Sequence, residues 1–237
     1  MKIVVTGGSG FIGSYLLPEL DNPINLDIKE GNDILTCDLP EADVVIHLAA
    51  EPGVVASVAD PYKNARTNIL ATIRLAERYK DSRFIFASSG GTIQESIESP
   101  YGLSKYTCEE YIKLLFTDYV ILRFPNVYGK GSRSVVDKWL KEDELIVYGD
   151  GRTYRIYAHV NDVVEAILKS IDWPSETYKL GTEQRYRVLD IAKKMGKPRL
   201  HRQPRQGEIT HGKSELLNTT PNWDAKLDVM KYIKDNL

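Results

Sequence analysis

The sequence predicts an α/β protein whose parallel sheet is covered by helices on both faces. A short β-branched run at 2–6 is followed by a glycine-rich turn and then by an apolar helical stretch. Further buried apolar runs lie at 43–48 and 83–87, and a long helical pattern separates them. Strands that alternate with helices are typical of parallel sheets, because a crossover between parallel strands needs about a dozen residues.

The composition is that of a globular protein with one large domain, or with a domain and a small appendage. Of the 237 residues, 42% are hydrophobic, and the net charge of −2 gives no broad basic surface, so we expect no nucleic-acid partner. No apolar run approaches the length of a membrane span, and no membrane partner is expected. Cys37 and Cys108 are too few for a disulfide framework or a zinc cluster, and no metal site is predicted. Met1 leads directly into a strand without room for a signal peptide, which predicts a cytoplasmic protein.

The glycines after the first strand have the spacing of a dinucleotide-binding loop. Gly7, Gly10 and Gly13 allow a tight turn, close approach to a pyrophosphate and close packing of helix on strand. The apolar segment from Tyr15 to Leu20 continues as a helix whose N-terminus faces the phosphates. Strand, turn and helix in this order predict a Rossmann-type doubly wound parallel sheet.

An acidic residue at the end of the second strand indicates which dinucleotide is bound. The strand Ile24 to Leu26 leads into Asp27, fourteen residues after Gly13. A carboxylate there can accept both ribose hydroxyls and repels a 2′-phosphate, which favours NAD over NADP. Two alternatives remain open: the carboxylate only caps the strand, or Lys29 accommodates the phosphate.

The stretch from 28 to 42 is too short for the usual helical crossovers. We therefore expect two helices to be missing and a third strand at Ile34–Leu35 to be vestigial, while Asp38 and Leu39 still border the adenine. The strand at 43–48 ends in small residues that let the backbone approach the cofactor. His47 in this strand is interpreted as a packing or supporting residue rather than a ligand.

A long helix is expected to begin at Asp60–Pro61 and to break at Asp81–Ser82. The strand at 83–87 then ends in a pair of serines. Ser89 at the carboxyl end of a central parallel strand opens into the crevice where such sheets bind ligands, although a plain turn has the same composition.

A tyrosine and a lysine four residues apart follow on the next helix, which begins after Ser99–Pro100. At this spacing Tyr101 and Lys105 lie on one face, so that the ammonium can sit beside the phenol, lower its pKa and make it a base. Tyrosine and lysine at this spacing also occur by chance in many helices.

The order of these motifs resembles that of the extended short-chain dehydrogenase/reductases, in the NAD-dependent epimerase/dehydratase branch of nucleotide-sugar enzymes. The likeness runs from Lys2 to about Trp223 and includes, besides the motifs above, Asn68, the run Leu122 to Gly129, and Gly149-Asp150-Gly151 followed by Arg155, His159-Val160 and Asp162.

The resemblance implies a role for each matching residue. Ser89 would bond the reacting sugar oxygen, Tyr101 would be the base, and Lys105 would fix the nicotinamide ribose and lower the tyrosine pKa. It also implies a homodimer that pairs the helices at 62–79 and 99–116. The predicted NAD-binding residues are Gly7, Gly10, Phe11, Ile12, Gly13, Asp27, Asp38, Leu39, Leu48, Ala49, Ala50, Asn68, Tyr101, Lys105 and Pro125.

The C-terminal third is expected to form a small α/β substrate lobe. We predict an NAD-binding domain at 1–129, to which 152–172 returns, and a lobe formed mainly by 130–237. Scattered arginines are the main indication that this lobe binds a substrate. Arg155 and Arg205 resemble the positions that bind a diphosphate in this family, and Asn126 would add a polar contact. For each arginine, a solvated surface position is an equal interpretation. Two amphipathic helices are expected, at 188–192 and 225–233.

The residues after the catalytic serine indicate the type of reaction. A related dehydratase needs an Asp-Glu pair where this chain has Gly90 and Gly91, and the cysteine of the epimerase-reductases is also absent. The remaining chemistry needs only the triad of Ser89, Tyr101 and Lys105. This favours a UDP-hexose 4-epimerase that oxidises a nucleotide-diphosphate sugar transiently with NAD. The alternatives are an NAD-dependent dehydrogenase of a small alcohol or other sugar, and a non-catalytic nucleotide-binding protein.

Overall fold

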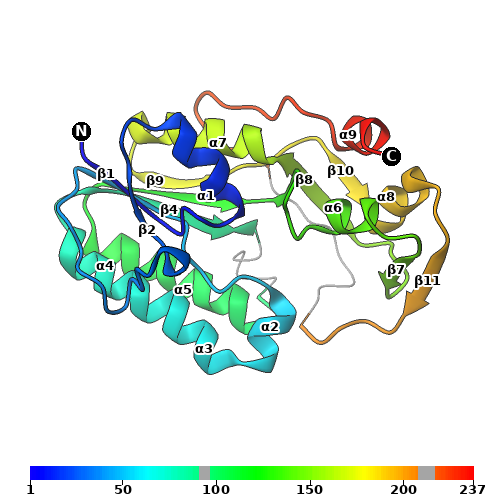
Figure 1. Cartoon of the computed structure of the whole chain (residues 1–237), viewed down its shortest axis with the longest axis horizontal. Coiled ribbons are helices and arrows are strands. Elements are labelled where there is room, and N and C mark those ends of the chain that lie inside the picture. The colour runs from blue at the N-terminus through cyan, green and yellow to red at the C-terminus, as the bar shows by residue number, and fades with distance from the viewer. Residues whose placement is uncertain (91–96, 208–216) are drawn as a thin grey trace.

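The structure is a computed structural model that describes residues 1–90, 97–207 and 217–237. Within these residues, a parallel sheet of six strands has the order β2-β1-β3-β4-β5-β9, which confirms the Rossmann-type α/β fold (Figure 1). Its strands are β1 (Ile3–Thr6), β2 (Ile24–Leu26), β3 (Val44–His47), β4 (Arg83–Ser89), β5 (Tyr119–Phe124) and β9 (Glu176–Lys179).

Helices cover both faces of this sheet because its central strands are apolar on both sides. On one face, α1 (Phe11–Leu16) and α7 (Val160–Lys169) pack over Val5, Ile46 and Leu122. The opposite face carries α4 (Ala71–Tyr79) and α5 (Pro100–Leu115), which bury Val45, Phe84 and Ile121 (Figure 1). The glycine loop before α1 and the predicted catalytic helix α5 are thus positioned by the same sheet.

The first helix is shorter than predicted. It ends at Leu16, and a 3₁₀ turn, η1 (Leu17–Glu19), follows it. Pro18 accounts for this change, because proline has no N–H with which to continue the α-helical hydrogen bonds.

The expected third strand is not formed: Ile34 and Leu35 lie in a turn, so β3 pairs directly with β1. Only a 3₁₀ turn, η2 (Ile28–Glu30), follows β2 before this region, as the short spacing predicted. Arg74 of α4 donates to the carbonyl oxygens of Ile34 and Cys37, and Arg78 donates to that of Leu39 at 3.1 Å. These guanidinium groups hold the connecting segment against α4 by bonding its carbonyl oxygens.

The long helix predicted after Asp60 is interrupted by a wider turn. It consists of α3 (Pro61–Ala65), the π-helical turn η3 (Arg66–Leu70) and α4. Asp60 caps the start of α3 by accepting from the Lys63 N–H at 2.9 Å. A further helix, α2 (Val54–Ala59), precedes it and was not predicted, because its six residues are too few to show helical periodicity.

In the part of the lobe that the structure describes, there are two small sheets and three helices. Strands β6 (Asn126–Tyr128), β8 (Tyr154–His159) and β10 (Arg185–Arg187) form one sheet, and β7 (Leu145–Tyr148) pairs with β11 (Arg199–Arg202) in the other. The helices are α6 (Val135–Leu140), α8 (Val188–Met195) and α9 (Val229–Asp235).

The last helix of the chain is shorter than predicted. The helix predicted at 225–233 begins only at Val229, because Asp228 is its N-cap and accepts from the Lys231 N–H at 2.8 Å. The chain returns to the main sheet through α7, the turn η6 (Ser170–Asp172) and β9. The division at residue 129 itself stays a prediction.

Candidate active site

The predicted triad gathers where β4 ends beside the start of α5. Ser99 caps α5 by accepting from the Gly102 N–H at 3.1 Å, and Pro100 occupies the first turn, as predicted. The N–H of Tyr101 donates to the Ser57 hydroxyl of α2 at 3.1 Å. A side-chain hydrogen bond joins Tyr101 to Ser89. The serine and the phenol therefore face the same place at the carboxyl edge of the sheet.

The ammonium group of Lys105 is buried and points at the sheet. Its Nζ donates to the Ala87 carbonyl oxygen at 2.8 Å and lies 4.5 Å from the centre of the Phe86 ring. Burial lowers the pKa of Lys105 to about 8, because desolvation disfavours the charged form. Most of the lysine is still protonated at neutral pH, so a positive charge is held at the strand end.

The pKa of Tyr101 differs from the expectation. Burial raises it above the usual value for a phenol, and the hydrogen bond with Ser89 opposes this rise. The lysine was expected to lower the pKa, but its Nζ is directed to Ala87 instead. The phenol is therefore protonated at neutral pH in this arrangement.

The glycine loop has the close packing that a pyrophosphate site requires. Gly7 has a φ of +72°, and a Cβ on it would lie 2.6 Å from the Ala49 N. A Cβ on Gly13 would lie 2.5 Å from the Gly8 backbone. Gly10 begins α1 without a side-chain cap, so the helix N-terminus at Phe11 and Ile12 faces the loop with backbone alone. This cradle fits a dinucleotide.

Asp27 is buried at the end of β2 beside the same loop. Its carboxylate oxygens accept from the Ser9 N–H and the Lys29 N–H, both at 2.9 Å. Lys29 Nζ donates to the Ser9 carbonyl oxygen at 2.7 Å, which holds the ammonium on the loop backbone. A carboxylate at this position leaves lone pairs for ribose hydroxyls, which fits NAD.

The other predicted cofactor residues also lie at strand ends or in connecting segments. Leu48, Ala49 and Ala50 follow β3, and Pro125 joins β5 to β6. Asp38 and Leu39 line a shallow hollow with Arg74 and Arg78.

Asn68 lies in the π-helical turn and is almost fully buried. Its side chain accepts from the Glu51 N–H at 2.8 Å and donates to the Ser104 hydroxyl at 3.0 Å. The π-helical turn η3 thus places the Asn68 amide between the loop after β3 and α5. Its main contacts are with the protein backbone and α5.

A chain of hydrogen bonds fixes the protonation of His47. The Ala49 N–H donates to the Thr6 hydroxyl, which lies 2.6 Å from His47 Nδ1. His47 Nε2 lies 3.1 Å from the Thr72 hydroxyl, which donates its proton to the Asn68 carbonyl. Since Thr72 can then only accept, the imidazole proton is on Nε2. Burial lowers the pKa of His47 to about 3, so the ring is neutral and supports the loop, as interpreted from the sequence.

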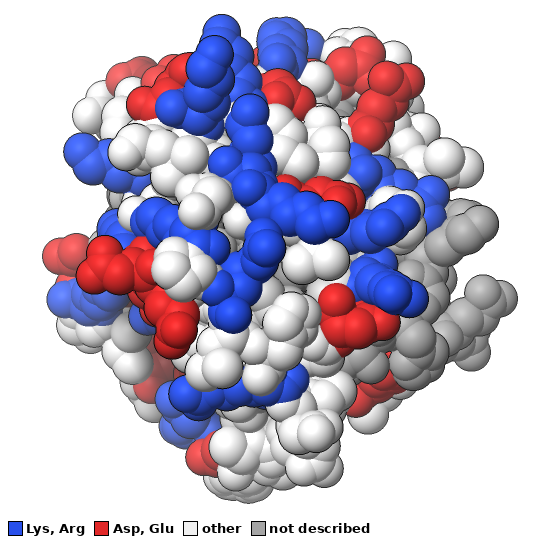
Figure 2. All heavy atoms as spheres, turned by 90° about the vertical axis from the view of Figure 1, so that its right-hand side faces the viewer, with Lys and Arg blue, Asp and Glu red and all other residues white. Residues whose placement is uncertain are grey.

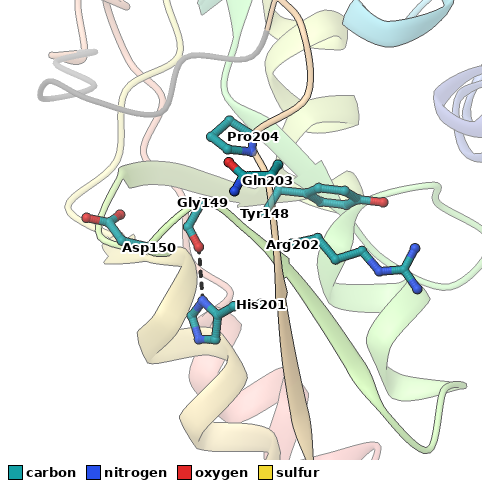
Figure 3. Close-up of a pocket in the computed structure, with 7 residues that line it drawn as sticks. All are labelled: Tyr148, Gly149, Asp150, His201, Arg202, Gln203 and Pro204. Carbon is teal, nitrogen blue, oxygen red and sulfur yellow. Dashed lines mark hydrogen bonds between the residues drawn. The ribbon is translucent and has the colours of Figure 1, made fainter.

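The lobe contains a hollow of about 840 Å³ lined by Tyr148, Gly149, Asp150, His201, Arg202, Gln203 and Pro204 (Figure 3). His201 Nδ1 donates to the Gly149 carbonyl at 2.9 Å. The guanidinium of Arg205 lies 4.1 Å from the centre of the Tyr148 ring, so this predicted substrate residue is at the same place. The chain then reaches Gly207, where a Cβ would lie 3.0 Å from the Val58 side chain of α2. The segment therefore connects the hollow with the helix next to Tyr101.

Many Lys and Arg side chains lie on this part of the molecule, interspersed with acidic ones, despite the small net charge. Figure 2 shows Lys and Arg side chains spread over the face that carries β7, β11 and α8. Arg199 and Arg202 of β11 are both exposed. Anionic ligands are attracted to such a surface.

Asn126 and Arg155 lie on paired strands of the lobe. Asn126 is exposed at the start of β6, and its Nδ2 donates to the Ile156 carbonyl at 3.1 Å. Arg155 of β8 is half-buried and opposes Tyr186 of β10. The two predicted diphosphate contacts are thus close in the sheet.

Sequence reasoning missed a buried acidic residue on α5. Glu109 accepts from the Ser88 hydroxyl and pairs with Arg123 of β5, with 2.6 Å between Oε2 and Nη2. The spacing could have indicated it, since Glu109 follows Lys105 by four residues and so lies on the same helical face.

In the described residues, no group of acidic, histidine and cysteine side chains could hold a metal ion. None of the described helices is long and apolar enough to cross a membrane.

Three comparisons relate this chain to known proteins. The model of the NAD dependent epimerase/dehydratase family matches residues 3–181. A candidate UDP-glucose 4-epimerase of Methanocaldococcus jannaschii is 32% identical, with 98% of this chain and 97% of that protein covered. An uncharacterised UDP-glucose epimerase of Bacillus subtilis is 31% identical over 81% of this chain and 80% of its own.

A crystal structure shows the same fold. The UDP-glucose 4-epimerase of Thermotoga maritima, solved with UDP-glucose, is 28% identical and has a TM-score of 0.84, with 99% of this chain and 96% of that chain covered. The alignment to the Methanocaldococcus protein spans 295 positions, so this chain of 237 residues lacks segments that the relative has. The cofactor is NAD, and the chain belongs to the NAD dependent epimerase/dehydratase family.

Proposed function

We propose that the protein is an NAD-dependent nucleotide-sugar epimerase that acts on a UDP-hexose at C4. The observation that carries the proposal is the pairing of Ser89 and Tyr101 at the end of β4, beside the buried ammonium of Lys105. The similarity to UDP-glucose 4-epimerases along nearly the whole chain supports this choice of substrate.

Ser89 and Tyr101 would have different roles toward the C4 hydroxyl. Ser89 holds the sugar oxygen by a hydrogen bond, and Tyr101 removes the proton of the C4 hydroxyl and later returns it. Because burial raises the pKa of Tyr101, a phenolate would need positive charge nearby, which Lys105 supplies and bound NAD would add. Bound NAD supplies the redox chemistry at C4. Lys105, whose Nζ donates to the Ala87 carbonyl, would also hold the nicotinamide ribose.

The residues after Ser89 disfavour elimination. Gly90 has no side chain to protonate a leaving group, where a dehydratase of this family uses an acid. Gly91, which stands at the second such place, lies outside the described residues. A reaction that needs only the triad is the simplest that this site supports.

The lobe supports a nucleotide-diphosphate substrate. Arg155 and Arg205 supply guanidinium groups for the diphosphate, and Asn126 adds a polar contact. The hollow is lined by Tyr148, and the Arg205 guanidinium lies 4.1 Å from the centre of its ring, so a nucleotide bound there would meet both side chains. We propose that the substrate extends from this hollow to Tyr101 along the segment before Gly207.

The test is to incubate the protein with UDP-galactose and NAD, separate the nucleotide sugars by chromatography and follow NADH absorbance. Conversion to UDP-glucose without free NADH supports the epimerase. Steady NADH release with a small alcohol or another sugar, and no epimer, favours a dehydrogenase. Binding of NAD and UDP without turnover of any sugar favours a non-catalytic nucleotide-binding protein.

A further inference from the structure

Three side chains on one stripe of α5 each contact one of the last three residues of β4. Tyr101, Lys105 and Glu109 are spaced by four residues and so lie one helical turn apart on one face. Lys105 Nζ donates to the Ala87 carbonyl at 2.8 Å, the Ser88 hydroxyl donates to Glu109, and Tyr101 bonds with Ser89. The helix is therefore fixed to the strand end by three successive polar contacts, two of which belong to the proposed triad.

The third contact is backed by an ion pair from the next strand. Ser88 of β4 and Arg123 of β5 are partners in the parallel register, so their side chains point to the same face. Glu109 lies between them: Arg123 Nε donates to Oε1 at 3.0 Å and Nη2 to Oε2 at 2.6 Å. The Glu109 side chain is 0% exposed and that of Arg123 is 14% exposed.

Stability alone does not explain a buried ion pair at this place. The cost of removing two charges from water offsets much of their attraction, and apolar side chains of similar volume often stabilise a core as well. A fork of hydrogen bonds does, however, define a geometry that apolar contacts do not.

We propose that Glu109, held by Arg123, is a positioning residue that fixes Ser88 and the rotation of α5, so that Tyr101 and Ser89 converge on one substrate hydroxyl beside a charged Lys105. This inference rests on the proposed function only for the identity of that hydroxyl.

Glu109 also provides negative charge near the lysine. Among the described residues, the titratable groups that interact electrostatically with Lys105 are Cys108 and Glu109 on α5 and His47 on β3, and Arg123 of β5 pairs with Glu109. Burial lowers the pKa of Lys105, while Cys108 and Glu109 raise it. His47 is neutral and Arg123 is paired, so Glu109 is the carboxylate that helps to keep the lysine protonated.

Two variants separate position from charge. Ser88→Ala cuts the contact with β4 and keeps the ion pair, and Glu109→Gln keeps an acceptor for Ser88 and removes the charge. Ser170→Ala is the matched control, because Ser170 is also buried, at 0% exposed against 4% for Ser88, but its hydroxyl donates to the Ile167 carbonyl of α7 at 2.7 Å. We would measure kcat and KM across pH, the NAD dissociation constant and the thermal midpoint of each.

Ser88→Ala should lower kcat about ten- to hundred-fold with NAD affinity unchanged, because a small misalignment of reacting groups is costly. In Glu109→Gln the basic limb of the pH profile should move to lower pH, since the lysine loses a nearby opposite charge. Ser170→Ala should keep the wild-type kcat and pH profile.

A measurement without turnover tests the charge directly. Carbon-13 NMR titration of labelled lysine, with Lys105→Arg to assign the signal, should show a lower Lys105 pKa in Glu109→Gln than in the wild type. If no sugar is converted by the wild type, the proposed function fails, while this titration still decides the inference. If Glu109→Gln does not fold, the kcat of Ser88→Ala tests the proposed positioning role of Glu109. Wild-type kcat in Ser88→Ala, or an unchanged Lys105 pKa in folded Glu109→Gln, would overturn it.

Discussion

The two ends of the proposed substrate site are built differently. At the junction of β4 and α5 the polar groups are buried, with Lys105 only 3% and Glu109 0% exposed, and each is bonded to β4. At the lobe end, His201, Arg202 and Arg205 lie on exposed chain around a wide hollow. Buried polar groups tolerate few arrangements, because an unpaired one costs about 1–3 kcal/mol, whereas long exposed side chains keep their rotamer freedom. We therefore expect changes at the junction to affect mainly the rate and changes in the lobe to affect mainly ligand binding.

The largest expected effect is at the junction. Tyr101→Phe should lower kcat by roughly a hundred- to ten-thousand-fold, because general-base catalysis is lost. NAD affinity should stay the same, since the phenol is proposed to act on the substrate proton. Steady-state kinetics and NAD titration measure the two quantities.

Tyr111→Phe is the control for this change, because Tyr111 lies on the same helix with 38% of its surface exposed. If Tyr101→Phe kept most of the activity, the phenol would not be the base.

Acid should lower the free energy of unfolding through the buried His47. His47 has a pKa of about 3 in the folded protein and an ordinary value of 6.5 when unfolded. Between these values the unfolded state takes up the proton and the folded state does not, so stability falls as pH falls from 6.5 toward 3. The loss should be about 1.4 kcal/mol per pH unit, followed by urea unfolding from pH 7 to pH 4.

His47→Gln removes this titration and is the comparison protein. Its stability should fall less steeply with acid than that of the wild type, whatever its stability at pH 7. Equal slopes would show that His47 is not held neutral.

At the lobe, changes should affect binding more than rate. Arg205→Met should raise KM for the UDP-sugar about ten- to hundred-fold with a small change in kcat, because it removes charge-assisted bonds to the diphosphate. Arg199→Met, an exposed arginine of β11, is the matched control. A fall in kcat at constant KM would contradict this division between the two ends.

The smallest effect on activity is expected on the outer surface of the catalytic helix. We propose a homodimer through α3, η3 and α5, where Tyr62 is 77%, Leu70 55%, Leu103 54% and Leu114 81% exposed. Exposed apolar side chains that cluster on neighbouring helices mark interfaces. Leu103→Lys with Leu114→Lys should give a monomer in sedimentation at micromolar concentration, with most activity retained.

Leu227→Lys changes an exposed leucine of the lobe and should leave the dimer intact. A wild-type protein that sediments only as a monomer would refute the interface.

The sequence by itself determined the elements whose signals are local. The glycine loop, the apolar strands and the start of α5 at Ser99–Pro100 were predictable, because turns, burial patterns and caps depend on neighbouring residues. The spacing of Tyr101 and Lys105 also placed both on one helical face. The missing crossover after Asp27 followed from chain length alone.

Only the tertiary structure decided which partners these residues meet. The Glu109 contacts join α5, β4 and β5, and the His47 chain joins β1, β3 and α4, across separations that no sequence period reports. The direction of the shift in the Tyr101 pKa likewise depends on burial. The Lys105 ammonium donates to the Ala87 carbonyl, a partner that the sequence spacing does not indicate. The start of α9 was set by the Asp228 cap, where apolar spacing alone had suggested a longer helix. Local pattern fixes where a side chain is along an element, whereas hydrogen bonding and desolvation in the packed core fix its chemical state.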